Sequence, residues 1–386
     1  MSTFKQQTPA PSRCMITGAI DVDVFFEMDA VPVMCNVLWP TREAALAAPS
    51  GDIHLGFSPS SGHIFNTVFD PDLLDYDQSY ENSLHFSPRF QQYVESLAAD
   101  LIERYQLRGK TIIDVGCGKG DFLRLICHMA DARGVGFDRS YEPTPDDDAN
   151  PQVTFIQSFF GEVHDDHYHA DMICCRHVLE HVPNPVDFLL DIRRALHQRR
   201  DALVFFEVPN ALYTLRDQGI WDIIYEHVSY FTPKSLTQAF TAAGFDVLRV
   251  NEVYGGQFLT IEARAAAEIR GRTGGDVPGD DELAGLVCDF ASAYRRKFDM
   301  WCAHLERFAA ASDVDAVRQR IRLVRQSDIS GYRGVLRRLR FHLTHLADLA
   351  YARIAFAGGD GRYSGRRGER ICATSVGWFI SAKKQG

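Results

Sequence analysis

Between about residue 88 and residue 265, the chain alternates short apolar runs with segments of helical periodicity. Nearly continuous apolar runs are typical of strands covered on both faces, as in a parallel sheet. We therefore predict an α/β fold with a Rossmann-like, seven-stranded sheet. Its strands are expected at residues 111–116, 134–138, 153–157, 171–175, 202–208, 246–250 and 257–263.

The last two apolar runs are expected to differ from the others in direction. They follow each other through Tyr254-Gly255-Gly256, and this spacing is too short for a crossover helix. We predict that they form an antiparallel pair at one edge of an otherwise parallel sheet.

Three helix starts are marked by a capping residue followed by proline. Proline has no N–H to lose at the first helical position, and its fixed φ suits a helix. The starts are predicted at Ser87-Pro88, Asn184-Pro185 and Thr232-Pro233.

The chain is predicted to contain three units. Residues 1–70 are weakly patterned and form a small N-terminal unit, residues 71–265 form the α/β domain, and residues 266–386 form a mainly helical, basic segment. The last 75 residues carry fifteen Lys or Arg against six Asp or Glu, unlike the acidic remainder. In this segment we expect helices over residues 282–355, an Arg-rich one at about 315–341 among them, and a strand at residues 371–381.

Composition excludes several classes of function. The formal net charge is −10, which repels a nucleic-acid backbone, so no nucleic-acid partner is expected. No apolar run reaches the roughly 20 residues of a membrane span, and the start of the chain lacks a signal peptide. We expect a cytoplasmic protein with no membrane partner, whose nine cysteines are reduced thiols.

A glycine-rich loop between a strand and a helix carries the strongest chemical signal. It has Gly116, Gly118 and Gly120, preceded by Asp114, and Asp138 ends the next strand. Glycines there let a ligand approach the backbone at a helix N-terminus, and the second carboxylate can accept both ribose hydroxyls. The spacing G-x-G-x-G differs from the dinucleotide fingerprint G-x-G-x-x-G. It resembles motif I of class I S-adenosylmethionine-dependent methyltransferases, in which these five residues bind the cofactor.

The segment after the fourth strand is predicted to face the same ligand crevice. Arg176, His177 and His181 follow the carboxyl end of that strand, where ligands bind in open α/β sheets. His177 and His181 are four residues apart, as in metal-binding pairs on helices, but the sequence shows no third ligand. We predict no metal here.

A loop before the last predicted helix concentrates polar and aromatic residues. Tyr225, Glu226 and His227 lie in it, and such a loop beside a crevice can supply a general base and hold a substrate. The alternative is a polar loop that only packs its aromatic side chains on the domain.

Taken together, the motifs over about residues 57–265 resemble the C-methyltransferases of deoxysugar biosynthesis. The motifs that carry this resemblance are Asp70 to Tyr76, Tyr80 to Ser83, Ser87-Pro88, the glycine loop, Arg176 to His181, Glu207 to Asn210 and Tyr225 to His227. In that family the acceptor is typically a nucleotide-linked keto sugar, and a base beside its carbonyl forms an enolate that attacks the sulfonium methyl group.

The resemblance also implies roles for individual residues. His227 is the candidate base, and Tyr76, His181, Tyr225 and Glu226 support it or position the acceptor. Cofactor contacts are expected from Tyr80, Ser83, Arg176 and His177.

Two departures from the family pattern limit the resemblance. The family has an N-terminal zinc unit with four cysteines, whereas the matching positions here are Cys14, Thr17, Ser58 and Ser61. One thiolate of four cannot hold tetrahedral zinc, so we predict a metal-free unit stabilised by packing. A second nucleotide-binding-like domain, which grips the sugar nucleotide in the family, has no counterpart in the C-terminal segment.

The resulting hypothesis is an S-adenosylmethionine-dependent methyltransferase acting on a small-molecule intermediate of natural-product biosynthesis, with carbon methylation ahead of oxygen or nitrogen methylation. An anionic or nucleotide-linked acceptor fits it. The alternatives are a nicotinamide oxidoreductase, disfavoured by the glycine spacing, and a non-catalytic cofactor-binding scaffold. The acceptor and the oligomeric state are left open.

Overall fold

The structure is a computed structural model of the 386-residue chain. It describes residues 12–35, 38–39, 41, 44–45, 47–74, 87–143, 151–161, 169–196, 199–269, 281–310, 369–374 and 377–382.

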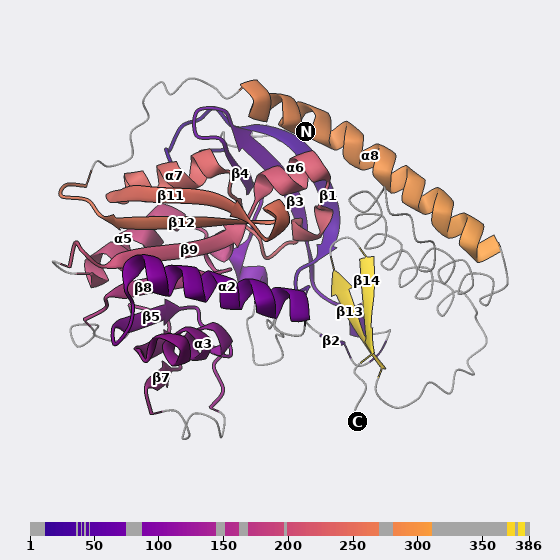
Figure 1. Ribbon diagram of the computed structural model, residues 1–386. Coiled ribbons are helices and arrows are strands. Elements are labelled where there is room, and N and C mark those ends of the chain that lie inside the picture. The colour runs from indigo at the N-terminus through magenta and orange to yellow at the C-terminus, as the bar shows by residue number, and fades with distance from the viewer. Residues whose placement is uncertain are drawn as a thin grey trace, which may run out of the picture.

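A seven-stranded sheet with the strand order β11-β12-β9-β8-β5-β6-β7 forms the centre of the molecule (Figure 1). The strands are β5 (Thr111–Val115), β6 (Arg133–Phe137), β7 (Val153–Ile156), β8 (Met172–Arg176), β9 (Leu203–Pro209), β11 (Phe245–Val253) and β12 (Phe258–Ala265). All seven were predicted. β11 and β12 pair antiparallel at one edge, as expected, and β12 inserts between β11 and β9.

Helices cover both faces of this sheet. They are α2 (Pro88–Tyr105) and α3 (Asp121–Ala130) on one face, and α5 (Pro185–Ala195) and α7 (Pro233–Ala242) on the other, with α6 (Ala211–Asp217) after β9. The three predicted starts are confirmed, because α2, α5 and α7 begin at a proline after Ser87, Asn184 and Thr232. Short 3-10 turns lie at Pro71–Leu73, Leu179–His181, Ile220–Asp222 and Tyr254–Gly256.

Neighbouring residues of each strand pack on opposite faces of the sheet. Ile112 and Phe205 pack with α2 and α3, whereas Ile113 and Phe206 pack with α5 and α7. This double coverage is why the strands read as continuous apolar runs instead of alternating ones. Both faces of the sheet are therefore buried, and the loops at the ends of its strands are the parts that can form a binding site.

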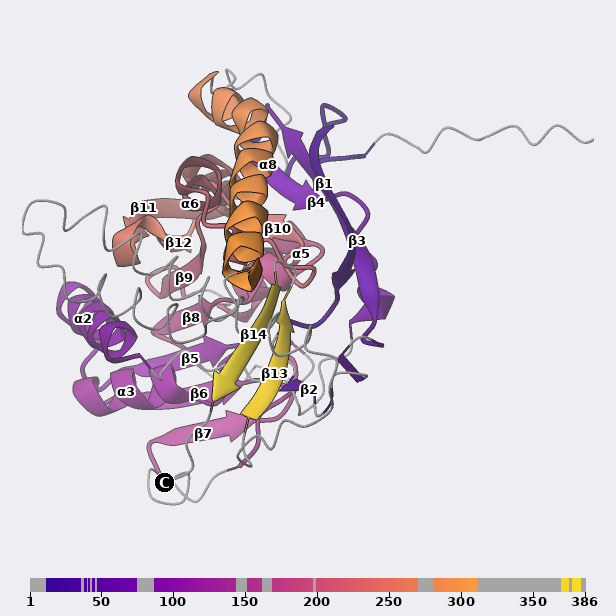
Figure 2. The ribbon, with the colours of Figure 1, turned by 90° about the vertical axis from the view of Figure 1, so that its right-hand side faces the viewer.

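The N-terminal unit forms a second sheet beside the first. Its strands are β1 (Asp23–Pro32), β3 (Ser50–Ser58) and β4 (His63–Asn66), and β10 (Ser229–Tyr230) from the α/β domain completes it. In Figure 2 the carboxyl ends of β5 and β7 point toward this sheet. The N-terminal unit thus flanks the edge at which ligands bind in α/β folds.

A 30-residue helix, α8 (Asp281–Ala310), packs against α6 and β1 (Figures 1 and 2). Leu283, Val287 and Phe290 of this helix are buried, and Phe290 contacts Phe26 with ring centroids 5.3 Å apart. The Arg-rich helix expected at about 315–341 lies outside the described residues.

The C-terminal strand expectation was wrong in one respect. In place of a single strand at 371–381, β13 (Glu369–Thr374) and β14 (Gly377–Ala382) form an antiparallel hairpin, and β13 also pairs with β2 (Leu38–Trp39). An apolar run of this length accommodates either one strand or two short ones joined by a turn, and the glycine at 377 begins the second.

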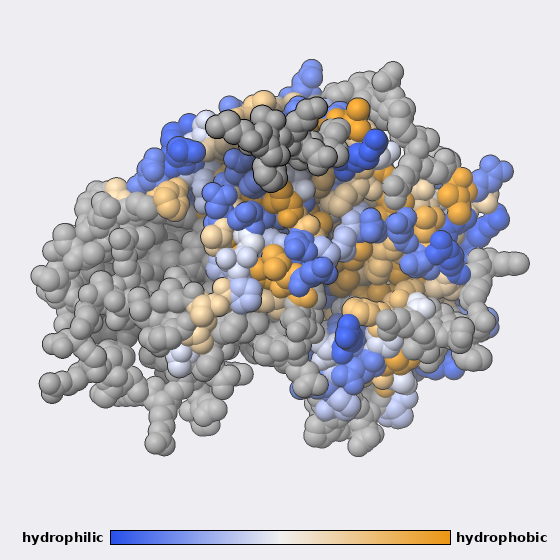
Figure 3. Space-filling model, turned by 180° about the vertical axis from the view of Figure 1, so that it is seen from behind, coloured by the Kyte–Doolittle hydropathy of each residue, from blue (hydrophilic) through white to orange (hydrophobic). Residues whose placement is uncertain are grey.

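The surface mixes hydrophilic and hydrophobic residues, as the view in Figure 3 shows. Large exposed apolar side chains include Ile20, Leu248 and Ile269. No helix among the described residues has the length and apolarity of a membrane span.

Candidate active site

The glycine loop connects β5 to α3 in left-handed backbone conformations. Gly116, Gly118 and Gly120 have φ values of 70°, 55° and 78°, a region in which side chains are strained. A Cβ atom on Gly116 would lie 2.3 Å from Cγ2 of Val178, and one on Gly120 would lie 2.3 Å from the Phe155 ring. The loop therefore packs directly against the segment that follows β8, which carries His181.

Two carboxylates flank this loop as predicted. Asp138, directly after β6, accepts from the Gly118 N–H at 2.8 Å and from the N–H and hydroxyl of Ser140 at 2.8 and 2.7 Å. Asp114 lies buried in β5, and burial raises its pKa to about 6. Each carboxylate oxygen has two acceptor positions, so Asp138 can brace the loop through three of its four positions and still accept a ribose hydroxyl at the fourth, on Oδ2.

These residues fit S-adenosylmethionine. The loop offers a backbone surface without side chains at the N-terminus of α3, and Asp138 offers an acceptor at the end of the neighbouring strand. The residues Gly116, Gly118, Gly120 and Asp138 would hold the cofactor.

A buried network of charges occupies the carboxyl ends of β8 and β9. The Glu207 carboxylate accepts a hydrogen bond from Nη2 of Arg176 at 2.9 Å and another from the Tyr93 hydroxyl. One of its oxygens also lies 2.7 Å from Nε2 of His177. The guanidinium of Arg176 also stacks over the Phe122 ring, 4.4 Å from its centroid. The guanidinium of Arg176 and the ring of His177, which the resemblance assigns to the cofactor, are thus directed at a carboxylate of the protein. Sequence reasoning gave Glu207 and Tyr93 no role of their own.

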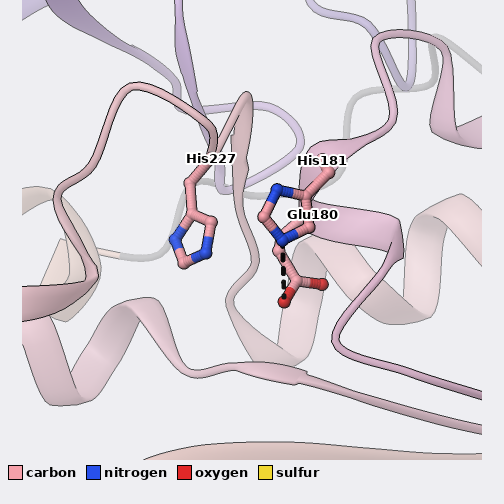
Figure 4. Close-up of side chains that lie close together, drawn as sticks. All are labelled: Glu180, His181 and His227. Carbon is pink, nitrogen blue, oxygen red and sulfur yellow. Dashed lines mark ion pairs between the residues drawn. The ribbon is translucent and has the colours of Figure 1, made fainter. Parts of the chain in front are cut away.

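The two candidate histidines lie against each other, as Figure 4 shows. The ring centroids of His181 and His227 are 4.9 Å apart. Nδ1 of His181 is 2.9 Å from the carbonyl oxygen of Glu226, and Nδ1 of His227 is 2.8 Å from that of Asp222. A carbonyl only accepts hydrogen bonds, so each Nδ1 carries the proton and each Nε2 carries a lone pair.

Both rings are neutral in the folded protein. Burial lowers the pKa of His181 to about 4, and burial together with the neighbouring ring lowers the pKa of His227 well below its usual value. Their Nε2 atoms are therefore bases or ligands at neutral pH.

Two buried carboxyl groups beside the histidines were missed by sequence reasoning. Glu180 is 1% exposed, and burial raises its pKa well above the usual value. Burial also raises the pKa of Asp222 to about 7. The sequence signal that could have identified Glu180 is its position directly before His181 and three residues after His177, next to the apolar residues Val178 and Leu179.

The side chains of Tyr225 and Glu226 are directed at the N-terminal unit. The Tyr225 hydroxyl accepts from the Asp70 N–H at 2.9 Å and donates to the Asp70 carbonyl at 3.2 Å, and its ring stacks on Phe69. Oε2 of Glu226 accepts from the Cys35 N–H at 3.1 Å. These contacts tie the loop that carries His227 to the N-terminal unit. Three further predicted site residues, Tyr76, Tyr80 and Ser83, lie outside the described residues.

All four positions that match zinc ligands in the resembling family lie together, because the Cys14 thiol also contacts the side chain of Thr17. Sγ of Cys14 is 3.2 Å from Oγ of Ser61, which also donates to the Ser58 carbonyl. Hydroxyl groups at Ser58 and Ser61 are poor substitutes for thiolates. The expectation of a metal-free N-terminal unit stays a prediction.

The strand order and the glycine loop define the class. Residues 90–250 match the family described as a methyltransferase domain, and the strand order and glycine loop of this part of the chain are those of a class I S-adenosylmethionine-dependent methyltransferase fold. The chain resembles the C-methyltransferase NovU of Streptomyces niveus, to which it is 28% identical over 184 residues. That alignment covers 46% of this chain and 43% of NovU, so less than half of the relative is matched.

Two methyltransferases are among the solved structures with a likeness to part of the chain. One is the 1,6-didemethyltoxoflavin-N1-methyltransferase of Burkholderia thailandensis with bound S-adenosylhomocysteine, at 18% identity and a TM-score of 0.37, covering 46% of this chain and 81% of that chain. Another is the magnesium protoporphyrin IX methyltransferase of Synechocystis, at 17% identity and a TM-score of 0.37, covering 49% of this chain and 91% of that chain.

The cofactor site can be tested at Asp138. Asp138→Ala removes charge-assisted hydrogen bonds worth roughly 1.5–3 kcal/mol, so affinity for S-adenosylhomocysteine should fall by about 10- to 150-fold. Calorimetry measures this, with circular dichroism as the check that the fold is intact. Unchanged affinity, or tight binding of a nicotinamide dinucleotide to the parent protein, would contradict the assignment.

Proposed function

We propose that the protein methylates a carbon atom of a small-molecule intermediate in natural-product biosynthesis, at a position made acidic by an adjacent carbonyl group. The observation that carries the proposal is the lone pair on Nε2 of His227, set beside the segment that packs on the glycine loop. The similarity to NovU, a C-methyltransferase, supports it.

His227 is the proposed general base. Its Nδ1–H is held by the Asp222 carbonyl, so the ring cannot turn away and Nε2 stays directed toward His181. Removing a proton from carbon requires a positioned base, which is worth roughly 10²–10⁴-fold in rate. Bound S-adenosylmethionine supplies a methyl group that is already activated on a sulfonium. What the protein adds is the base and the alignment.

His181 is proposed to position the acceptor. Its ring is 20% exposed and forms one wall beside His227, while the Glu226 carbonyl fixes its orientation. The side chains of Tyr225 and Glu226 act indirectly, because they connect the loop that carries His227 to Asp70 and Cys35. For Tyr76, Tyr80 and Ser83 the family roles remain proposals.

Hydrogen–deuterium exchange tests carbon methylation without requiring turnover. The full chain is incubated in D₂O with S-adenosylhomocysteine and a panel of carbonyl compounds, nucleotide-linked keto sugars and non-nucleotide ones, and mass spectrometry measures deuterium uptake next to the carbonyl. We expect enzyme-dependent exchange with the true acceptor. Methyl transfer from labelled cofactor to that acceptor without exchange would favour oxygen or nitrogen methylation, and cofactor binding without either reaction on the natural intermediate would favour a scaffold.

A further inference from the structure

We infer that Glu180, His181 and His227 form a binding site for a transition-metal dication such as Zn²⁺. One ligand atom from each of the three side chains lies within 4.8 Å of the other two. In Figure 4 the three side chains converge from two separate loops.

The histidines present the nitrogen that a metal requires. In each ring Nδ1–H is held by a backbone carbonyl, of Glu226 for His181 and of Asp222 for His227. A hydrogen bond of this kind at the second nitrogen is typical of metal-ligating histidines, because it fixes the tautomer and aims the other lone pair. Two such rings with centroids 4.9 Å apart form a pair of nitrogen ligands.

Glu180 would supply the third ligand, and its buried carboxyl group is a place where a cation would be stabilising. Its carboxyl group is almost fully buried, with Oε1 4.0 Å from Nε2 of His181 and 3.8 Å from Nδ1 of His177. Within the described part of the chain, Oε2 of Glu180 and Oδ2 of Asp222 are buried without a hydrogen-bond partner. Burial disfavours the ionised form of such a carboxyl group, and a bound dication would stabilise that form.

The donor set selects the kind of ion. Two imidazoles and one carboxylate suit Zn²⁺ and other first-row dications, whereas Mg²⁺ and Ca²⁺ prefer oxygen ligands. Bonds to zinc of about 2.0–2.2 Å bring the ligand atoms of a tetrahedral site to about 3.4 Å from one another. Binding would therefore require side-chain rotation that shortens the 4.0 Å distance between Oε1 of Glu180 and Nε2 of His181. The three side chains would leave the fourth coordination position of the metal open.

Metal binding has a consequence that rests on the proposed function. The Nε2 lone pair of His227 cannot accept a proton from the acceptor while it binds a metal. Zinc at this site should therefore inhibit methyl transfer reversibly, and a chelator should restore it.

Zinc titration of the untagged full chain, stripped with chelator and free of cofactor and acceptor, tests the site directly. Calorimetry should show one site. Glu180→Gln and His181→Ala should each weaken it by more than the roughly 10- to 100-fold that loss of an orienting partner costs. Binding of S-adenosylhomocysteine and the melting temperature show that both variants are folded. Co²⁺ should give the visible absorption of a tetrahedral site in the parent protein and not in the variants.

The matched controls are His54→Ala and Cys14→Ser. His54 belongs to a second His and carboxylate group with Asp29 and Asp52, which is exposed, and Cys14 is the remaining thiol of the zinc-type positions. Zinc affinity should be unchanged in both. Loss of the site in either control, unchanged affinity in both test variants, or no binding to the parent protein would overturn the inference. Zinc binding with normal deuterium exchange at the acceptor would keep the metal site and instead refute His227 as the base.

Discussion

Replacing His227 with alanine should lower the rate of methyl transfer by roughly 10²–10⁴-fold, the usual contribution of a positioned general base. The reason is geometric, because the Nε2 lone pair of His227 is fixed by the hydrogen bond from Nδ1 to the Asp222 carbonyl. Binding of S-adenosylhomocysteine should change by less than about threefold, since the glycine loop and Asp138 are untouched. Transfer of labelled methyl groups and calorimetry measure the two quantities.

Two further variants separate base catalysis from general damage. His181→Ala should show a milder loss, expressed mainly in the Michaelis constant of the acceptor, if this ring only positions it. His54→Ala, at a half-buried histidine on the N-terminal sheet, should leave the rate unchanged. Near-normal turnover in His227→Ala would place the base elsewhere, with His181 next in line. If neither histidine matters, an acceptor with an oxygen or nitrogen nucleophile is the better interpretation.

Glu207→Gln should lower the free energy of unfolding by roughly 3–5 kcal/mol, the usual cost of removing one partner from a buried ion pair. The variant leaves the guanidinium of Arg176 buried without its carboxylate and weakens the contacts of His177 and Tyr93. Urea denaturation followed by fluorescence measures the change. The double variant Arg176→Met with Glu207→Gln should recover much of it, because no unpaired charge remains.

The same carboxylate predicts a pH dependence. Burial alone would raise the pKa of Glu207, but Arg176 and the hydrogen bond from His177 lower it to about 2 from the usual 4.5. A depressed pKa stabilises the fold fully above about pH 4.5, and this stability is lost as the pH falls toward 2. The parent protein should therefore lose its advantage over Glu207→Gln as the pH falls through that range. A difference that is constant with pH, or a double variant no more stable than Glu207→Gln, would contradict the role of the charge pair.

The central sheet was predictable because its sequence signals are local and strong. Strands covered on both faces read as continuous apolar runs, and Ser87, Asn184 and Thr232 mark helix starts next to prolines. The glycine loop was also predictable, since its spacing follows from the backbone conformation that a cofactor requires. The position of β12 between β9 and β11 was not, because strand order depends on pairing that no local pattern specifies.

The acceptor side of the site was predictable only in part. His181 and His227 were identified, but their contact depends on two loops that are far apart in the sequence. Glu180 was missed because one acidic residue beside a histidine is common, and its burial is a tertiary property. The Asp222 carbonyl could not be found from the sequence at all, since every residue has a carbonyl group.

The pairing of β10 with β4 sets an order of events in folding. The hydrogen bond between Gly118 and Asp138 joins two residues of one βαβ segment, so this part of the cofactor site needs only contacts between residues close in the sequence. The loop that carries His227 instead leads directly into β10, in which Ser229 pairs with Phe65. These two residues are separated in the sequence by most of the α/β domain. Contacts between residues far apart in the sequence form late, because closing the long loop between them costs entropy before the contacts can stabilise it. The Gly118 and Asp138 part of the cofactor site is therefore expected to form before the loop that carries His227 is in position, so cofactor binding would precede acceptor binding during folding.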